Sequence, residues 1–353
     1  MYQAACTAVT FLSGTEQRMN SAVNIADGKN MSRTVLSAEG LTRDFEVRRG
    51  FLGKSTLRAL DGVSFDVKAQ QTLAVVGESG CGKSTLARQL TMIDTPSAGR
   101  LLIHGVDPAT ADRATKANLR RAVQMVFQNP FASLNPRKTV LQTLSEPLIT
   151  GSNLKQLERN DKVFESMRTV GLRPEHASRY PHMFSGGQRQ RIAFARAIAM
   201  DPKIVVADEP VSALDVSIQA QILNLIMDLQ DRLGTSYVFI THNLSVVRHV
   251  ADEVMVMYLG RCVEIGKKDE VLNHPRHPYT RLLLASTPRL GRASGQQSAV
   301  IKARGELPSP LNVPKGCAFS TRCPHVLPRC VEFRPELLPV SGTSVACHRI
   351  DEI

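Results

Sequence analysis

The sequence predicts an α/β fold whose parallel sheet is built around a phosphate-binding loop. Residues 77–84 read GESGCGKS, and they stand between the apolar run 72–76 and the helix-forming stretch 85–90. Glycines at these spacings let successive backbone N–H groups turn inward around phosphate oxygens. Downstream, apolar strands at 204–207 and 237–241 alternate with helical patterns that begin at Ser185 and Ile218. This alternation is typical of a buried parallel sheet.

The other segments follow in order along the chain. Residues 1–35 are polar and rich in small side chains, and their apolar patch lacks the basic segment of a secretory signal, so we expect a disordered extension. Strands at 57–67 and 101–104 place the loop among mixed β structure. Residues 140–170 have apolar positions at three- to four-residue spacing, which predicts an inserted helical segment. Residues 288–314 collect Gly, Ser, Gln and Pro without periodicity, as in a linker.

Composition narrows the class of protein. A chain of 353 residues with 42% hydrophobic content is long enough for two domains, or for one large domain with an appendage. It has no run of the roughly 18 to 20 apolar residues that a membrane-spanning helix needs, so we expect any membrane association to be peripheral. The net charge of +12 is spread widely and no tryptophan is present, which argues against nucleic acid as a partner. Seven cysteines without a signal peptide indicate a reducing cytoplasm.

Chemistry is expected beyond the carboxyl ends of the strands, where open parallel sheets bind their ligands. In the loop, Lys83 supplies a charge to the β and γ phosphates, and Ser84 offers a hydroxyl to Mg²⁺. The strand 204–207 delivers Asp208 and Glu209: one carboxylate would orient Mg²⁺ or its water, and the next would polarise the attacking water. His242, at the end of the strand 237–241, would contact the γ-phosphate or that water.

A second anion site is expected at Ser185, Gly186, Gly187 and Gln188, which begin a helix whose unsatisfied N–H groups attract negative charge. A Ser-Gly-Gly turn is most often a simple helix cap. Since the chain already has one phosphate cradle, a second one makes sense if it closes over nucleotide held by another subunit. The sequence therefore predicts an ATPase that works as a pair.

These motifs resemble the nucleotide-binding subunits of ATP-binding cassette (ABC) transporters from about residue 36 to the C-terminus. The resemblance implies a P-loop NTPase cassette at 36–285 with a RecA-like parallel core, an antiparallel β subdomain and a helical subdomain at about 129–185. It also implies a small cysteine-containing C-terminal extension at 286–353. Two positions depart from the family pattern: Phe184 stands where leucine is usual, and Asn243 where aspartate is common. Neither removes a group that touches phosphate.

The resemblance also assigns the site. Catalytic roles fall to Glu209 as base, His242 as switch and Gln128 in the Q-loop. Mg²⁺ would be held by Ser84, Gln128 and Asp208. Phe45 would stack on adenine, and Asp215 would end the D-loop, residues 212–215. The remaining ATP contacts are the Walker A residues Gly77, Glu78, Ser79, Gly80, Cys81, Gly82, Lys83, Ser84 and Thr85, and the signature residues Ser185, Gly186, Gly187 and Gln188.

Within this family, the stretches 125–137, 179–185 and 274–280 are similar to the ATPases of oligopeptide and dipeptide permeases. That resemblance implies ATP-driven peptide import at the cytoplasmic face of the inner membrane. The partners it implies are a paralogous ATPase, two transmembrane permeases and, indirectly, a periplasmic peptide-binding protein. Nickel and haem importers share such ATPases. A soluble ABC ATPase acting on nucleic acid or ribosomes is the alternative, although such proteins usually carry a second cassette or a coiled-coil insertion.

Four cysteines near the C-terminus, Cys317, Cys323, Cys330 and Cys347, need a separate explanation. Four thiolates in a loop-rich region of a cytosolic protein suit a metal or a cluster. Buried free cysteines are the alternative, because the spacing C-x5-C-x6-C-x16-C is longer than in common zinc ribbons. The resemblance implies a [4Fe-4S] cluster, with Zn²⁺ as the second choice.

Overall fold

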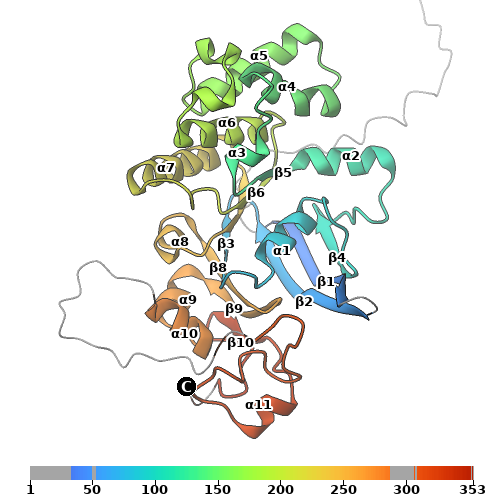
Figure 1. Cartoon of the computed structure of the whole chain (residues 1–353), viewed down its shortest axis with the longest axis vertical. Helices are drawn as coiled ribbons and strands as arrows, with labels where there is room; N and C mark the ends of the chain where they lie inside the picture. The colour runs from blue at the N-terminus through green and yellow to red at the C-terminus, as the bar shows by residue number, and fades with distance from the viewer. Residues whose placement is uncertain (1–32, 50–52, 287–305, 307, 351, 353) are drawn as a thin grey trace, which may run out of the picture. The chain divides into compact units, whose positions relative to one another are not determined.

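Figure 1 shows the computed structural model, which describes residues 33–49, 53–286, 306, 308–350 and 352. The predicted N-terminal extension, 1–35, lies outside the described residues except for its last three, where the first strand already begins at Thr34. Most of the predicted linker, 288–314, also lies outside them. All of the described residues belong to one compact unit.

The core is an eight-stranded sheet with the strand order β10-β11-β9-β8-β3-β7-β6-β5. The five neighbouring strands β8, β3, β7, β6 and β5 run parallel to one another. Beyond β8, the strand β9 pairs antiparallel with β8, and β11 pairs antiparallel with β9. Strands β3, β6 and β7 are buried along their whole length, which explains their continuous apolar sequences. The strand bounds are β3 Thr72–Val76, β5 Val123–Val126, β6 Ile204–Asp208, β7 Ser236–Ile240, β8 Glu253–Tyr258, β9 Arg261–Lys267, β10 Leu338–Val340 and β11 Thr343–Val345.

A second sheet, of three antiparallel strands in the order β2-β1-β4, packs near the phosphate-binding loop. Its strands are β1 Thr34–Arg49, β2 Gly53–Lys68 and β4 Ala98–Ile103. Buried side chains such as Leu41 and Leu60 join Leu86 of the helix after the loop and Val75 of β3 in one apolar cluster. The strand predicted at 101–104 stops one residue early because His104 adopts a positive φ of 51° in the turn that follows.

Along the chain between β5 and β6, the helices α4, α5 and α6 pack together (Figure 1). Two of them begin with reciprocal caps: Thr139 with Gln142 at α4, and Ser185 with Gln188 at α6. No helix of the described residues is long and apolar enough to cross a bilayer. The bounds are α1 Lys83–Leu90, α2 Arg113–Ala122, α3 Pro130–Ser133, α4 Val140–Gly151, α5 Gln156–Thr169, η1 Pro174–Ser178, η2 Pro181–Met183, α6 Gly186–Ile198, α7 Val216–Leu233, α8 Leu244–Val250, α9 Lys268–Asn273, α10 Pro278–Ala285 and α11 Pro328–Glu332.

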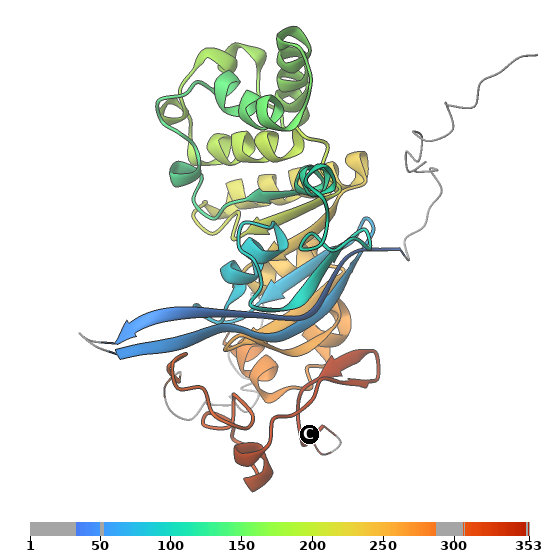
Figure 2. The same ribbon diagram turned by 90° about the vertical axis from the view of Figure 1, so that its right-hand side faces the viewer.

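The C-terminal segment, residues 308–350, extends the main sheet (Figure 2). Strand β11 pairs with β9, so that Val345 lies opposite Glu264. Phe319 is fully buried in an apolar cluster with Tyr258 of β8 and Tyr279 of α10. The α/β fold predicted from the sequence is confirmed, and the strands β10 and β11 of this segment are added to the edge of the same sheet.

Candidate functional site

The phosphate-binding loop joins β3 to α1. Lys83 is buried, and its amino group donates to the carbonyl oxygens of Gly77 at 2.8 Å and Glu78 at 2.9 Å. Gly82 has a φ of 104°, and a Cβ on it would lie 2.4 Å from the carbonyl oxygen of Ala59. Since no other residue fits this backbone without strain, the glycine spacing that predicted the loop has a structural cause here.

Asp208, the last residue of β6, lies beside the loop. Its Oδ1 is buried and has no hydrogen-bond partner in the described protein. Burial raises the pKa of Asp208, while a hydrogen bond from the Ser84 hydroxyl and the charge of Lys83 oppose that rise. The structure therefore brings Asp208, Ser84 and Lys83 together, with one carboxylate oxygen left to accept a ligand.

Glu209, Gln128 and His242 form a second cluster at the carboxyl ends of the strands. Glu209 Oε2 accepts from Gln128 Nε2 at 2.9 Å, and Glu209 Oε1 lies 3.0 Å from His242 Nδ1. Glu209 has a φ of 44°, uncommon for a residue with a side chain, and its backbone N–H donates to Ile240 of the neighbouring strand β7 at 2.9 Å. Such an outlier held by its surroundings is often found at functional sites. The three residues with predicted catalytic roles thus lie in direct contact.

The signature residues, Ser185 to Gln188, pack against the first turn of α7. Ser185 Oγ accepts from the backbone N–H of Gln188, and the side-chain oxygen of Gln188 accepts from the N–H of Ser185. A Cβ on Gly187 would lie 2.5 Å from Ile218 of α7, so the glycine permits this close approach. The helix-cap alternative therefore describes what Ser185 does within this chain, and contact with nucleotide stays a prediction.

The other residues with predicted nucleotide contacts lie on elements other than the loop and α1. Figures 1 and 2 both show α6 and α1 as separate helices with sheet strands between them. Asp215 is exposed at the start of α7 and makes no side-chain cap. Phe45 lies half-buried on β1 opposite Leu57, with the guanidinium of Arg43 4.7 Å from its ring centre. Its stacking on adenine stays a prediction.

Two contacts of Glu78 in the loop were not predicted from the sequence. The carboxylate of Glu78 pairs with Arg322 at 2.9 Å, and the backbone N–H of Glu78 donates to the Tyr279 hydroxyl at 2.9 Å. These partners lie 244 and 201 residues further along the chain. No local pattern could have indicated pairs so distant in sequence.

The four C-terminal cysteines line one small cavity, together with His325 and His348. Burial raises the pKa of Cys317 to about 12 and also raises the pKa of Cys323 and Cys347. Each of the described cysteines is free of disulfides. Within the described ranges, no group of three or more His, Cys, Asp or Glu side chains has the arrangement of a metal site. The four thiols share a cavity without being set at ligand distances.

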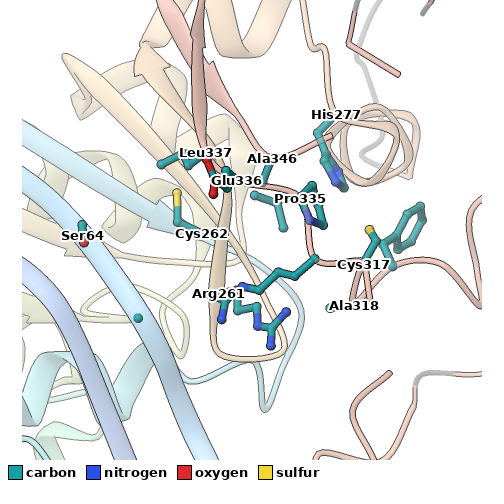
Figure 3. Close-up of a pocket in the computed structure, with 14 residues that line it drawn as sticks. Ser64, Arg261, Cys262, His277, Cys317, Ala318, Pro335, Glu336, Leu337 and Ala346 are labelled. Atoms are coloured by element: carbon teal, nitrogen blue, oxygen red, sulfur yellow. The ribbon is translucent and has the colours of Figure 1, made fainter. Parts of the chain in front are cut away.

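A larger pocket of about 440 Å³, which shares Cys317 and Phe319 with the cysteine cavity, lies between β2, β9 and the C-terminal segment (Figure 3). Arg261 and Arg334 line it, and both pair with Asp61 of β2, at 2.7 Å and 3.4 Å. None of the residues with predicted nucleotide contacts borders this pocket. It marks where the C-terminal segment docks on the sheets.

Comparisons with known proteins agree with the motifs. Residues 60–212 match the ABC transporter family, and residues 263–330 match the oligopeptide/dipeptide transporter C-terminal region. The di/tripeptide transport ATP-binding protein DppF of Pseudomonas aeruginosa is 57% identical over 90% of this chain and 98% of its own length. The dipeptide transport ATP-binding protein DppF of Escherichia coli is 54% identical over 91% of this chain and 96% of its own.

Among solved structures, a dimeric ATP-binding cassette in a post-hydrolysis state with bound ADP and Pi has a TM-score of 0.58 and 28% identity. The match covers 66% of this chain and 98% of that one. The fold and the family that the motifs indicated are both confirmed. The chain belongs to the family of ATP-binding subunits of dipeptide and oligopeptide ABC transporters, and it is an ATPase of that type.

Proposed function

We propose that this ATPase powers the import of dipeptides or oligopeptides across the cytoplasmic membrane. The similarity to dipeptide transport ATP-binding proteins, which spans nearly the whole length of those relatives, carries the proposal. Peripheral attachment at the cytoplasmic face follows from it, through two transmembrane permeases fed by a periplasmic peptide-binding protein. The peptide itself never meets this chain.

At the nucleotide, the loop from Gly77 to Thr85 would hold the phosphates with its backbone N–H groups, and Lys83 would contact the β and γ oxygens. Asp208 offers a buried oxygen without a partner beside the Ser84 hydroxyl, and Gln128 adds an amide oxygen; these donors suit Mg²⁺. When bound, Mg²⁺ would neutralise charge on the phosphates.

Hydrolysis would depend on Glu209. Its carboxylate is held between Gln128 and His242, so its position is fixed before substrate arrives. In our proposal Glu209 polarises the attacking water, and His242 keeps the carboxylate in place and contacts the γ-phosphate. Gln128 connects this site to the helical subdomain, which would push on the permease as nucleotide binds.

We further propose that two ATPases, this chain and a paralogue, close over two nucleotides. The residues Ser185 to Gln188 and Asp215 would then face the nucleotide of the partner. Support comes from the similar solved cassette, which is dimeric with bound ADP and Pi. Exposed apolar side chains beside the two motifs also fit an interface: Val216 is 82% exposed and Met183 59%. The proposed boundaries are a cassette at 36–285 and a C-terminal domain at 286–353.

For the four C-terminal cysteines, we propose a [4Fe-4S] cluster, with Zn²⁺ as the alternative. Support comes from the donor set alone: four thiols around one cavity. Their side chains would have to shift to reach ligand distances. Anaerobic purification with iron, sulfide and zinc analysis tests the proposal, and a colourless protein with no bound iron or zinc would refute both choices.

The transport proposal is tested by uptake of a labelled dipeptide in cells that lack this gene. Uptake should fall and return with the parent chain but not with Glu209→Gln. If cells that lack this gene lose nickel or haem uptake but take up the dipeptide normally, the proposal that peptides are the transported substrate is refuted. Co-sedimentation of the chain with ribosomes instead of membranes would refute the importer and favour the soluble alternative.

A further inference from the structure

The phosphate-binding loop carries a negative side chain of its own. Glu78 follows the first glycine of the loop, next to the backbone that would surround the triphosphate. A free carboxylate here would repel phosphate, because like charges raise each other's energy at short range. Its partner therefore matters for nucleotide binding.

That partner is Arg322 of the C-terminal segment. Arg322 Nη1 lies 2.9 Å from Glu78 Oε2 and 3.1 Å from Oε1, and the two side chains are only 11% and 28% exposed. The guanidinium also lies 5.9 Å from the ring centres of both Tyr258 and Phe319. Burial alone would lower the pKa of Arg322, but its hydrogen bonds to Glu78 and Tyr258 outweigh burial and raise it, so the group stays charged. A partly buried pair of this kind is worth more than a surface ion pair.

The cysteine-bearing turn fixes the place of Arg322. The N–H of Arg322 donates to the carbonyl of Phe319 at 3.0 Å, and the N–H of Ser320 donates to that of Cys317 at 3.0 Å. The N–H of Cys317 in turn donates to the carbonyl of Cys330 at 2.7 Å. Arg322 thus sits in a turn between two of the four cysteines and is tied through Cys317 to a third.

We propose that Arg322 is a positioning residue for ATP binding: it neutralises Glu78 and holds its carboxylate, so that the cysteine-bearing turn supports the phosphate-binding loop of its own subunit. This inference rests on the proposed nucleotide site. The contact joins two regions that match separate families, since Glu78 lies in the ABC transporter match and Arg322 in the C-terminal match. The C-terminal segment then has a function at the ATP site.

The test measures equilibrium binding of Mg-ATP to the full-length chain by calorimetry, with KM and kcat for ATP hydrolysis beside it. Arg322→Gln should raise the Kd and the KM about tenfold, because it leaves a carboxylate unpaired beside the phosphates. It should change kcat less than about twofold, since Glu209 and its partners are untouched. In a Glu78→Gln background, which removes the charge that Arg322 neutralises, Arg322→Gln should change the Kd less than about twofold.

Arg334→Gln is the matched control. Arg334 also joins the C-terminal segment to the sheets, but through Asp61 of β2 and not through the loop. Its Kd for Mg-ATP should stay within about twofold of the parent value. If Arg322→Gln does not fold, Arg322→Lys gives the test instead. It keeps the positive charge but replaces the guanidinium, whose Nη1 contacts both oxygens of Glu78, by an ammonium group of different shape. It should weaken binding about threefold, and only where Glu78 is present.

An unchanged Kd in Arg322→Gln, or an equal loss with and without Glu78, would overturn the inference. A loss of kcat at constant KM would do the same. If the parent chain binds no Mg-ATP at all, the proposed nucleotide site fails instead, so the two failures are distinguishable.

Discussion

Replacing Glu209 by glutamine should stop steady-state ATP turnover and leave ATP binding intact. The carboxylate of Glu209 has both oxygens engaged, with Gln128 Nε2 at 2.9 Å and His242 Nδ1 at 3.0 Å. Glutamine has nearly the same shape, but its NH₂ group cannot accept a hydrogen bond. The amide oxygen can still accept from Gln128, but the NH₂ group can only donate towards His242 Nδ1, and the charge that would polarise water is gone.

The magnitude follows from these contacts. Loss of a positioned general base typically slows a reaction by about 10² to 10⁴, which is roughly 3 to 5.5 kcal/mol on the barrier. Folding should suffer much less, because one broken hydrogen bond at a partly buried position costs about 1 to 3 kcal/mol. The Kd for Mg-ATP should change less than about threefold, since Lys83, Ser84 and the loop backbone are unaltered.

Phosphate release and calorimetric binding on the same preparation separate the two effects. Glu253→Gln is the matched control, because Glu253 is also partly buried and paired, with Lys68 at 3.1 Å, but on β8. That variant should keep its turnover. If Glu209→Gln keeps a turnover rate within about tenfold of the parent rate, Glu209 is not the catalytic base. If the variant no longer binds Mg-ATP, the expectation that Glu209 acts in hydrolysis without contributing to binding is wrong.

Two further predictions concern the loop and the C-terminal docking site. Gly82→Ala should weaken Mg-ATP binding and lower the melting temperature, because the added Cβ would collide with the carbonyl oxygen of Ala59. Gly105→Ala is the control, since Gly105 also has a positive φ but has open space around it, and this variant should bind Mg-ATP normally in the same calorimetric assay. Burial lowers the pKa of His277 from 6.5 to about 3. Between these two pH values the imidazole is protonated in the unfolded chain but neutral in the folded chain. The free energy of unfolding should therefore fall by roughly 1.4 kcal/mol for each pH unit as the pH drops from 6.5 towards 3. Urea unfolding at pH 6.5 and 5 should show this loss in the parent but a flatter profile in His277→Asn, which can still cap Tyr279; equal slopes would contradict it.

Local chemistry made the nucleotide motifs predictable. The phosphate-binding loop needs its glycines, lysine and serine within eight residues, so one stretch of sequence contains the whole cradle. The helix beginning at Ser185 and the strand ending at Asp208 were predicted because caps and apolar runs are also local. Glu209 and His242 were both expected at the carboxyl ends of parallel strands, which meet at one edge of a sheet, but their direct contact was not predicted.

Long-range pairing limited the rest. Strands β8 and β9 were not predicted, although β8 is the parallel neighbour of β3 and lies directly beside the loop strand. Their place in the sheet depends on partners far away in the chain, which a single sequence does not identify. The same holds for Arg322: its position among the cysteines was evident, but its contact with Glu78 is a product of the folded chain.

Two glutamates of the candidate site, Glu78 and Glu209, differ mainly in the side chains that contact them, and this difference bears on the role proposed for each. Glu78 and Glu209 are comparably sheltered, with 28% and 16% of their side chains exposed. Glu78 faces a guanidinium, which is always charged and cannot take up or release a proton in this range. Glu209 instead faces an amide and an imidazole, which orient it without a permanent charge. A carboxylate paired with a permanent cation is a weaker base, whereas one held by polar groups can still polarise water. This difference supports the positioning role proposed for Arg322 at Glu78 and the catalytic role proposed for Glu209.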